Sequence, residues 1–120
     1  MKYRIINVKD NINVVKIEDA TILISNEQSA LDVFMGLYYE TGENKFIISK
    51  DNLVDDFFNL KTKIAGEILQ KIINYRMKLA IVGDFSIYES KSLRDFMYEC
   101  NSGRDIFFVK NESEALKLLS

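Results

Sequence analysis

Short apolar runs alternate along this chain with stretches whose apolar residues recur at helical spacing. Near the amino terminus, two β-branched segments (residues 3–8 and 12–17) flank a turn at Asp10 and Asn11, a pattern that predicts a β-hairpin. Residues 21–24 fit either a further strand or a segment along the edge of the sheet. Three later apolar runs predict buried strands: KFIIS (45–49), KLAIV (78–82) and DIFFV (105–109).

Two long helices are predicted in the first half of the chain. The first begins at Ser25, where Gln28 three residues later completes a capping-box pattern, and it ends at Gly42. The second begins near Leu60, because apolar residues repeat every four positions from there to Ile72. Between the strand at 45–49 and this helix, we expect a loop or one irregular helical turn.

Two more helices are predicted in the second half. Ser90 caps the third helix, and Gly103 follows its end in a position that suits a left-handed residue. Asn111, with Glu114 three residues on, caps the closing helix.

The predicted order of elements is β-β-α-β-α-β-α-β-α over a single α/β domain spanning residues 1–120. Strands that alternate with helices are joined by right-handed crossovers, which make parallel strand pairs. We therefore expect a mixed, mainly parallel five-stranded sheet with four helices.

Composition narrows the class of protein. With 120 residues, 48% of them hydrophobic and a net charge of −2, the chain is globular and offers no basic excess for nucleic acid. No apolar run approaches the ~18 residues that cross a bilayer, and polar residues interrupt the amino-terminal run as no signal peptide would allow. Since the one cysteine, Cys100, has no partner for an intramolecular disulfide, we expect a cytoplasmic protein.

The chain also lacks histidine, which removes the Ser-His-Asp and Cys-His nucleophile pairs and most transition-metal sites. We expect no metal and no cofactor, and we favour a protein without enzymatic activity. A catalyst built from this chain would transfer protons through Asp, Glu, Lys or Tyr.

Polar residues follow the ends of the predicted parallel strands. Ligands of open α/β sheets lie outside the carboxyl ends of these strands, so Lys50, Asp84, Ser86 and Lys110 could meet at one rim. Two cations, a carboxylate and a hydroxyl would suit a small anion. In the plainer interpretation, the same residues only satisfy turns and helix caps.

A second group of residues suggests a surface for a protein partner, or for a second copy of the chain in a homodimer. It combines the start of the second long helix with the loop and first turns of the third helix. Its members are Asn59, Lys61, Thr62, Phe85, Tyr88, Lys91 and Arg94. Exposed aromatic residues would mark such a surface, whereas buried ones would only fill the core.

Two stretches of the chain, LKTKIAGEILQKIINYRMKLAIVGDFS (60–86) and SKSLRDFMYECNSGRDIFFV (90–109), resemble a bacterial family known as domain of unknown function 4180. This resemblance covers nearly the whole chain and implies no activity. The order of elements also resembles that of STAS domains, the fold of anti-sigma-factor antagonists. In those domains, a serine near the position of Asn59 and Leu60 is phosphorylated; no serine stands here, and only Thr62 is close.

Two functions therefore remain open. The first is a non-enzymatic interaction or regulatory module, and the alternative is a protein that binds a small anion or nucleotide at the strand rim, with or without catalysis. The shape of the rim discriminates between them. A deep pocket favours the ligand, whereas a flat rim with exposed Phe57, Phe58 or Phe85 favours the interaction module.

Overall fold

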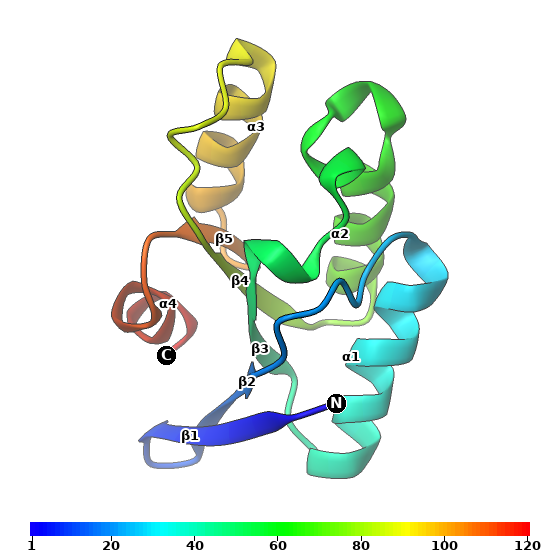
Figure 1. Cartoon of the computed structure of the whole chain (residues 1–120). Coiled ribbons are helices and arrows are strands. Elements are labelled where there is room, and N and C mark those ends of the chain that lie inside the picture. Colours follow the sequence, from blue (N-terminus) through cyan, green and yellow to red (C-terminus); the bar gives the residue numbers. More distant parts are fainter.

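One five-stranded sheet forms the centre of the computed structural model, which describes all 120 residues (Figure 1). The strands lie in the order β1-β2-β3-β4-β5, and four α-helices cover the sheet. The predicted fold class is confirmed. The strands are β1 (Tyr3–Lys9), β2 (Ile12–Ile17), β3 (Lys45–Ser49), β4 (Lys78–Val82) and β5 (Ile106–Val109), and the α-helices are α1 (Glu27–Thr41), α2 (Ile64–Asn74), α3 (Lys91–Asn101) and α4 (Glu112–Leu119).

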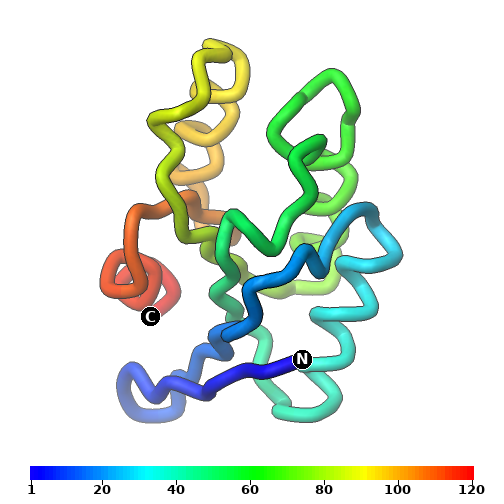
Figure 2. Tube along the Cα trace, viewed as in Figure 1, coloured from blue at the N-terminus to red at the C-terminus, as the bar shows by residue number.

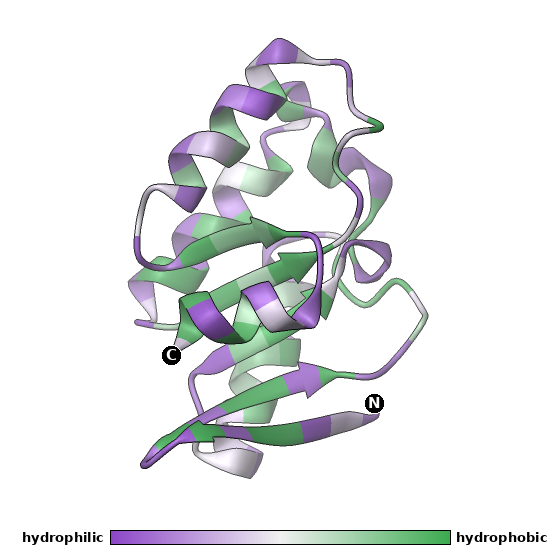
Figure 3. Cartoon of the chain, turned by 90° about the vertical axis from the view of Figure 1, so that its left-hand side faces the viewer, coloured by the Kyte–Doolittle hydropathy of each residue, from purple (hydrophilic) through white to green (hydrophobic).

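The order of the strands decides which face each helix covers. β1 and β2 form the predicted antiparallel hairpin, and every later pair of neighbouring strands is parallel. From β2 to β5, each connection moves one strand in the same direction, so crossovers of one hand place α1, α2 and α3 on the same face. No strand follows α4, and this helix folds back over the opposite face, in front of the strands in Figure 3.

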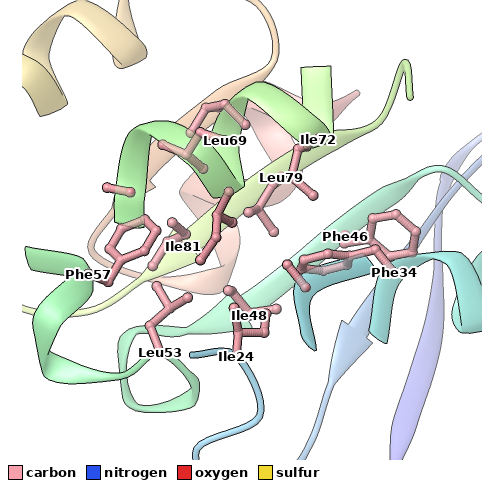
Figure 4. Packing of buried hydrophobic residues seen from close by; sticks show 14 of the residues in the cluster. Ile24, Phe34, Phe46, Ile48, Leu53, Phe57, Leu69, Ile72, Leu79 and Ile81 are labelled. Atoms are coloured by element: carbon pink, nitrogen blue, oxygen red, sulfur yellow. The ribbon is translucent and has the colours of Figure 1, made fainter. Parts of the chain in front are cut away.

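The alternation of side chains along the strands creates two hydrophobic cores. The larger core lies between the sheet and helices α1 to α3, where Phe46 and Ile48 of β3 meet residues such as Phe34 of α1 and Ile72 of α2 (Figure 4). Ile47, between them in sequence, points to the other face and belongs to the smaller core beneath α4. A strand that is buried on both faces carries apolar side chains at successive positions, which explains the continuous apolar runs in the sequences of β3, β4 and β5.

The amino-terminal hairpin lies at one end of the molecule and α3 at the other (Figure 2). Asn11, in the hairpin turn, adopts a left-handed conformation with φ 64°. Glu112 at the start of α4 accepts hydrogen bonds from Lys16 Nζ at 2.8 Å and from Arg4 Nη2 at 3.0 Å, and these contacts tie α4 to the hairpin.

Two details at helix ends differ from the sequence prediction. The cap of α1 is Asn26 instead of Ser25, because the Asn26 side chain accepts from the amide of Ser29 while the Ser29 hydroxyl accepts from the amide of Asn26. Gly103 is not left-handed. The last turn of α3 tightens instead, since Gly103 donates to the carbonyl of Cys100 at 3.0 Å. Gly42, by contrast, ends α1 with the expected left-handed φ of 78°.

The second long helix starts later than the apolar pattern predicts. Residues Leu60–Thr62 form a separate 3₁₀ turn, and Lys63 has a left-handed φ of 65°, so α2 begins only at Ile64. Leu60 nevertheless packs against the larger core. An apolar residue one turn ahead of a helix satisfies the same spacing whether or not the helix extends to it, so the pattern cannot locate this boundary.

Between β3 and α2 the chain forms short 3₁₀ turns around one buried polar residue, Asn52. Its amide nitrogen donates to the carbonyls of Asp19 and Thr21 at 2.7 and 2.9 Å, and its side-chain oxygen accepts from the amide of Ser49 at 2.9 Å. The segment predicted as a strand or an edge segment forms only one isolated bridge, between Ile24 and Leu53. Asn52 therefore joins the segment before α1 to the loop after β3.

Candidate functional site

At the carboxyl ends of β4 and β5, the chain turns toward opposite faces of the sheet. The connection after β4 leads to α3 on one face of the sheet, whereas the connection after β5 leads to α4 on the other. Two neighbouring parallel strands whose connections leave to opposite faces create a crevice between their ends, which is the usual ligand position in open α/β sheets.

A cleft of about 560 Å³ opens at this point. The loop after β4, one side of α3, the end of β5 and the start of α4 form its walls. Its lining residues are Gly83, Asp84, Phe85, Ser86, Arg94, Met97, Tyr98, Asn101, Phe108, Val109, Lys110 and Glu114. We call this space the β4–β5 cleft.

Three of the four predicted rim residues line the β4–β5 cleft: Asp84, Ser86 and Lys110. Lys50 lies outside its wall. A β-carbon built on Gly83 would lie 2.7 Å from Lys50 Cβ, so the Lys50 side chain passes close to Gly83. Its ammonium group lies 5.6 Å from the centre of the Tyr88 ring.

Asp84 is held in place by its own loop. Its carboxylate accepts hydrogen bonds from the hydroxyl of Ser86 at 2.6 Å and from the amide of the same residue at 3.0 Å. The hydroxyl contact, together with the amide and the nearby ammonium groups of Lys50 and Lys110, lowers the pKa of Asp84 below its ordinary value. The cleft therefore contains a carboxylate that stays ionised at neutral pH.

The two cations of the cleft are uncommitted. Ion pairs elsewhere in the structure use Arg4, Lys16, Lys71, Lys78 and Lys91, whereas Arg94 and Lys110 have no carboxylate within 4.0 Å. Glu114 also lines the cleft, but one of its carboxylate oxygens accepts from the backbone amide of Lys110 at 3.0 Å. Two cationic residues of the cleft wall thus form no ion pair.

The remaining wall is largely apolar and aromatic. Met97 and Phe108 are buried beneath it, whereas the Tyr98 side chain is 75% exposed. Asn101 is the one amide side chain in the wall, and it already forms hydrogen bonds with the backbone of β5. Its nitrogen donates to the Phe108 carbonyl at 3.1 Å, and its oxygen accepts from the Phe108 amide at 2.7 Å. Its main hydrogen-bonding groups are therefore directed at β5.

The aromatic residues whose exposure would favour the interaction module pack inward. Phe57 and Phe58 are buried, and Phe85 and Tyr88 are half-buried against the larger core. The Tyr88 ring stacks on Phe58 with centroids 4.9 Å apart, while Phe85 meets Phe108 edge-on at 5.4 Å. Burial raises the pKa of the Tyr88 hydroxyl. The rim thus has a cleft and no exposed Phe57 or Phe58.

The other members of the predicted interaction surface are polar, and all of them except Arg94 lie outside the cleft. Asn59 and Lys61 are exposed in the turn before α2, where the Thr62 hydroxyl lies 2.8 Å from both the Asp56 and the Asn59 carbonyls. Lys91 pairs with Asp95 at 3.0 Å in the first turn of α3. Only Phe85 and Arg94 belong to both the predicted surface and the cleft.

Sequence reasoning missed most of the helical wall. Met97, Tyr98, Asn101 and Glu114 line the cleft, and none of them is among the rim residues predicted from the sequence. A signal was present, because Arg94, Tyr98 and Asn101 have i, i+4, i+7 spacing and share one side of the helix. Which side of α3 would border an opening could not be read from this spacing.

Elsewhere in the molecule, no group of three or more acidic or cysteine side chains is arranged to hold a metal ion. None of the helices has the length and apolar character needed to span a bilayer. Cys100 is half-buried, and this burial raises the pKa of its thiol.

The fold and the cleft define an α/β protein with one mixed sheet and an opening where the chain diverges after β4 and β5. The family model described as domain of unknown function 4180 matches residues 9–119, and the chain belongs to this family. This confirms the resemblance noted in the sequence. No curated protein and no solved structure matches the chain, and the resemblance to STAS domains is not confirmed.

Proposed function

We propose that this protein binds a small anionic molecule in the β4–β5 cleft. The observation that carries the proposal is the pair of unpaired cations, Arg94 and Lys110, beside an opening of about 560 Å³. This volume lies within the range of ~300–1,000 Å³ that small-molecule sites occupy. A fold of this kind hosts many functions, so the proposal depends on the cleft and not on the fold.

The local charges support an anion over a cation. Asp84 and Glu114 already accept hydrogen bonds from the backbone, whereas neither Arg94 nor Lys110 has a carboxylate partner. An incoming anion would gain two charge-assisted hydrogen bonds without breaking an existing ion pair. A cation would meet the same two positive charges, and the carboxylates that could offset them, Asp84 and Glu114, already accept hydrogen bonds.

Inorganic phosphate is the simplest probe for this proposal. Titration followed by amide chemical shifts should give saturable changes at Gly83 and Lys110, with millimolar affinity. Lys110→Gln should weaken binding roughly tenfold, because a hydrogen bond to a charged group contributes about 1.5–3 kcal/mol. Lys117→Gln, on the exposed side of α4, removes the same charge outside the cleft and should leave the affinity unchanged.

Two results would contradict the proposal. Shifts that do not saturate, or that spread evenly over all surface lysines, would indicate only nonspecific screening. Equal losses of affinity in Lys110→Gln and Lys117→Gln would show that net charge, rather than the cleft, attracts the anion.

The interaction module stays a second candidate, favoured by one residue. Ile87, in the loop between β4 and α3, is 59% exposed although its neighbour Tyr88 packs inward. An apolar side chain at the tip of this loop would suit a protein partner or a homodimer. A sedimentation mass of one chain at high concentration would contradict the homodimer. The cytoplasmic location expected from the single cysteine also stays a prediction.

A further inference from the structure

We propose, on the basis of the anion site just described, that the natural occupant of the β4–β5 cleft is a nucleoside monophosphate whose base stacks on α3 without being selected by its edge. Three parts of the wall support this assignment: the cations, the carboxylates and the aromatic side.

The two cations would bind the anionic end of the ligand. Arg94 and Lys110 together offer two positive charges, which match the double charge of a phosphate monoester better than the single charge of a carboxylate. Longer phosphate chains need more donors. The loop from Gly83 to Ser86 has only one glycine and does not form the glycine-rich cradle that holds di- and triphosphates.

The two carboxylates would accept hydrogen bonds from the middle part of the ligand. An ionised carboxylate accepts hydrogen bonds and donates none. Asp84 receives two hydrogen bonds from Ser86, and Glu114 receives one from the Lys110 amide, which leaves further acceptor positions on both groups. Hydroxyl groups between the phosphate and the ring, as ribose provides, would occupy these positions.

The aromatic side of the wall would pack against the end of the ligand that lies farthest from the phosphate. Tyr98 is exposed over three quarters of its surface and is followed around the wall by Met97 and Phe108. A flat ring that covers Tyr98 would remove apolar surface from water, and stacking of a base on an aromatic side chain contributes about 1–3 kcal/mol. A ligand that joins a flat ring to the phosphate would use both sides of the same cleft at once.

The wall offers little to read the edge of a base. Base edges are distinguished by amide and charged side chains that pair with their donors and acceptors. The only amide here is Asn101, and its nitrogen and its oxygen each already form one hydrogen bond with the backbone of Phe108, which directs the amide at β5. We therefore expect a purine and a pyrimidine nucleotide to bind with similar affinity.

The test compares AMP, UMP, ribose 5-phosphate and inorganic phosphate on the full chain by amide chemical shifts and calorimetry. AMP and UMP should bind within about threefold of each other and roughly tenfold more tightly than ribose 5-phosphate, which lacks only the base. Tyr98→Ser should remove most of this advantage while leaving phosphate binding unchanged. Tyr98→Phe keeps the ring and should keep the advantage. Because Tyr98 is exposed, neither variant disturbs the core.

These measurements distinguish a wrong nucleotide assignment from a wrong anion site. If phosphate, ribose 5-phosphate and AMP bind equally, the anion site stands and the nucleotide assignment is overturned. If phenylalanine, which joins a ring to a carboxylate and an ammonium group, binds more tightly than AMP, the class of ligand is wrong. If none of the phosphate compounds binds, the proposed function falls as well. Arg94→Gln should weaken every phosphate ligand, whereas its control Arg104→Gln, in the loop before β5, should not.

Discussion

Asn52 shows how one residue can hold a region that has almost no regular structure. It is the single polar residue that is fully buried, and its side chain bonds to Asp19, Thr21 and Ser49. Its own carbonyl accepts from the amides of Leu23 and Ile24. Buried polar groups need such partners, so the loop after β3 and the segment before α1 depend on the same amide.

Replacing Asn52 with leucine should therefore be strongly destabilising. The change keeps the approximate size of the side chain and leaves two carbonyls and one amide without their partner. We expect the free energy of unfolding to fall by about 2–3 kcal/mol, measured by urea denaturation. Asn74→Leu, at the exposed end of α2, makes the same chemical change and should alter stability by less than about 0.5 kcal/mol. A similar loss in both variants would refute this role.

At the scale of the element, helix side chains cover part of one edge of the sheet. β5 is the last strand, and side chains of the two helices that flank it bond to backbone groups at Phe108 and at Lys110, just after the strand. Asn101 of α3 pairs with both backbone groups of Phe108, and Glu114 of α4 accepts from the amide of Lys110. An uncovered edge strand is a template for pairing with another chain. The same side chains thus close the edge and shape the β4–β5 cleft.

We expect Asn101→Ala to open this edge. The Phe108 amide should exchange with solvent faster, and the free energy of unfolding should fall by about 1–2 kcal/mol because two backbone groups lose a partner. The variant should also aggregate more readily on heating than the wild type. Ser102→Ala, which removes the neighbouring hydroxyl from the end of α3, is the control. Unchanged protection of the Phe108 amide would show that water replaces Asn101 without loss.

At the scale of the whole molecule, Glu112 links two parts that are far apart in sequence. It lies at the start of α4 and meets Lys16 and Arg4 of the hairpin. The hydrogen bond from Lys16, with the charges of Lys16 and Arg4, lowers the pKa of Glu112 below its ordinary value. The contact joins the ends of the chain across the face of the sheet that α4 covers.

This lowered pKa predicts how stability depends on pH. Because the pKa in the folded state lies below the unfolded value, the contribution of Glu112 is fully present above the unfolded value, near 4.5. It is lost as pH falls through the lower folded value. Thermal unfolding of Glu112→Gln should therefore show a smaller decrease in Tm between neutral and acidic pH than the wild type. Parallel curves for the two proteins would contradict the link, and Glu99→Gln serves as the control because Glu99 forms no ion pair.

The sequence by itself determined the elements and their class. Apolar runs such as KFIIS and KLAIV are readable because strands buried on both faces have no polar positions, and caps such as Ser90 and Asn111 are readable because they act on amides three residues away. These interactions are local. Asp84, Ser86 and Lys110 could be brought to one rim on the same basis, since parallel strands end at the same edge.

Only the tertiary structure decided the faces and the walls. The direction in which strands are added places α3 on one face of the sheet, whereas packing against the opposite face places α4. Their separation forms the cleft and brings Arg94, Tyr98 and Glu114 to its wall. The tertiary structure also buries Phe57 and Phe58 and places Lys50 outside the wall of the β4–β5 cleft. The physical reason is that each of these outcomes depends on contacts between residues distant in sequence, which no local spacing encodes.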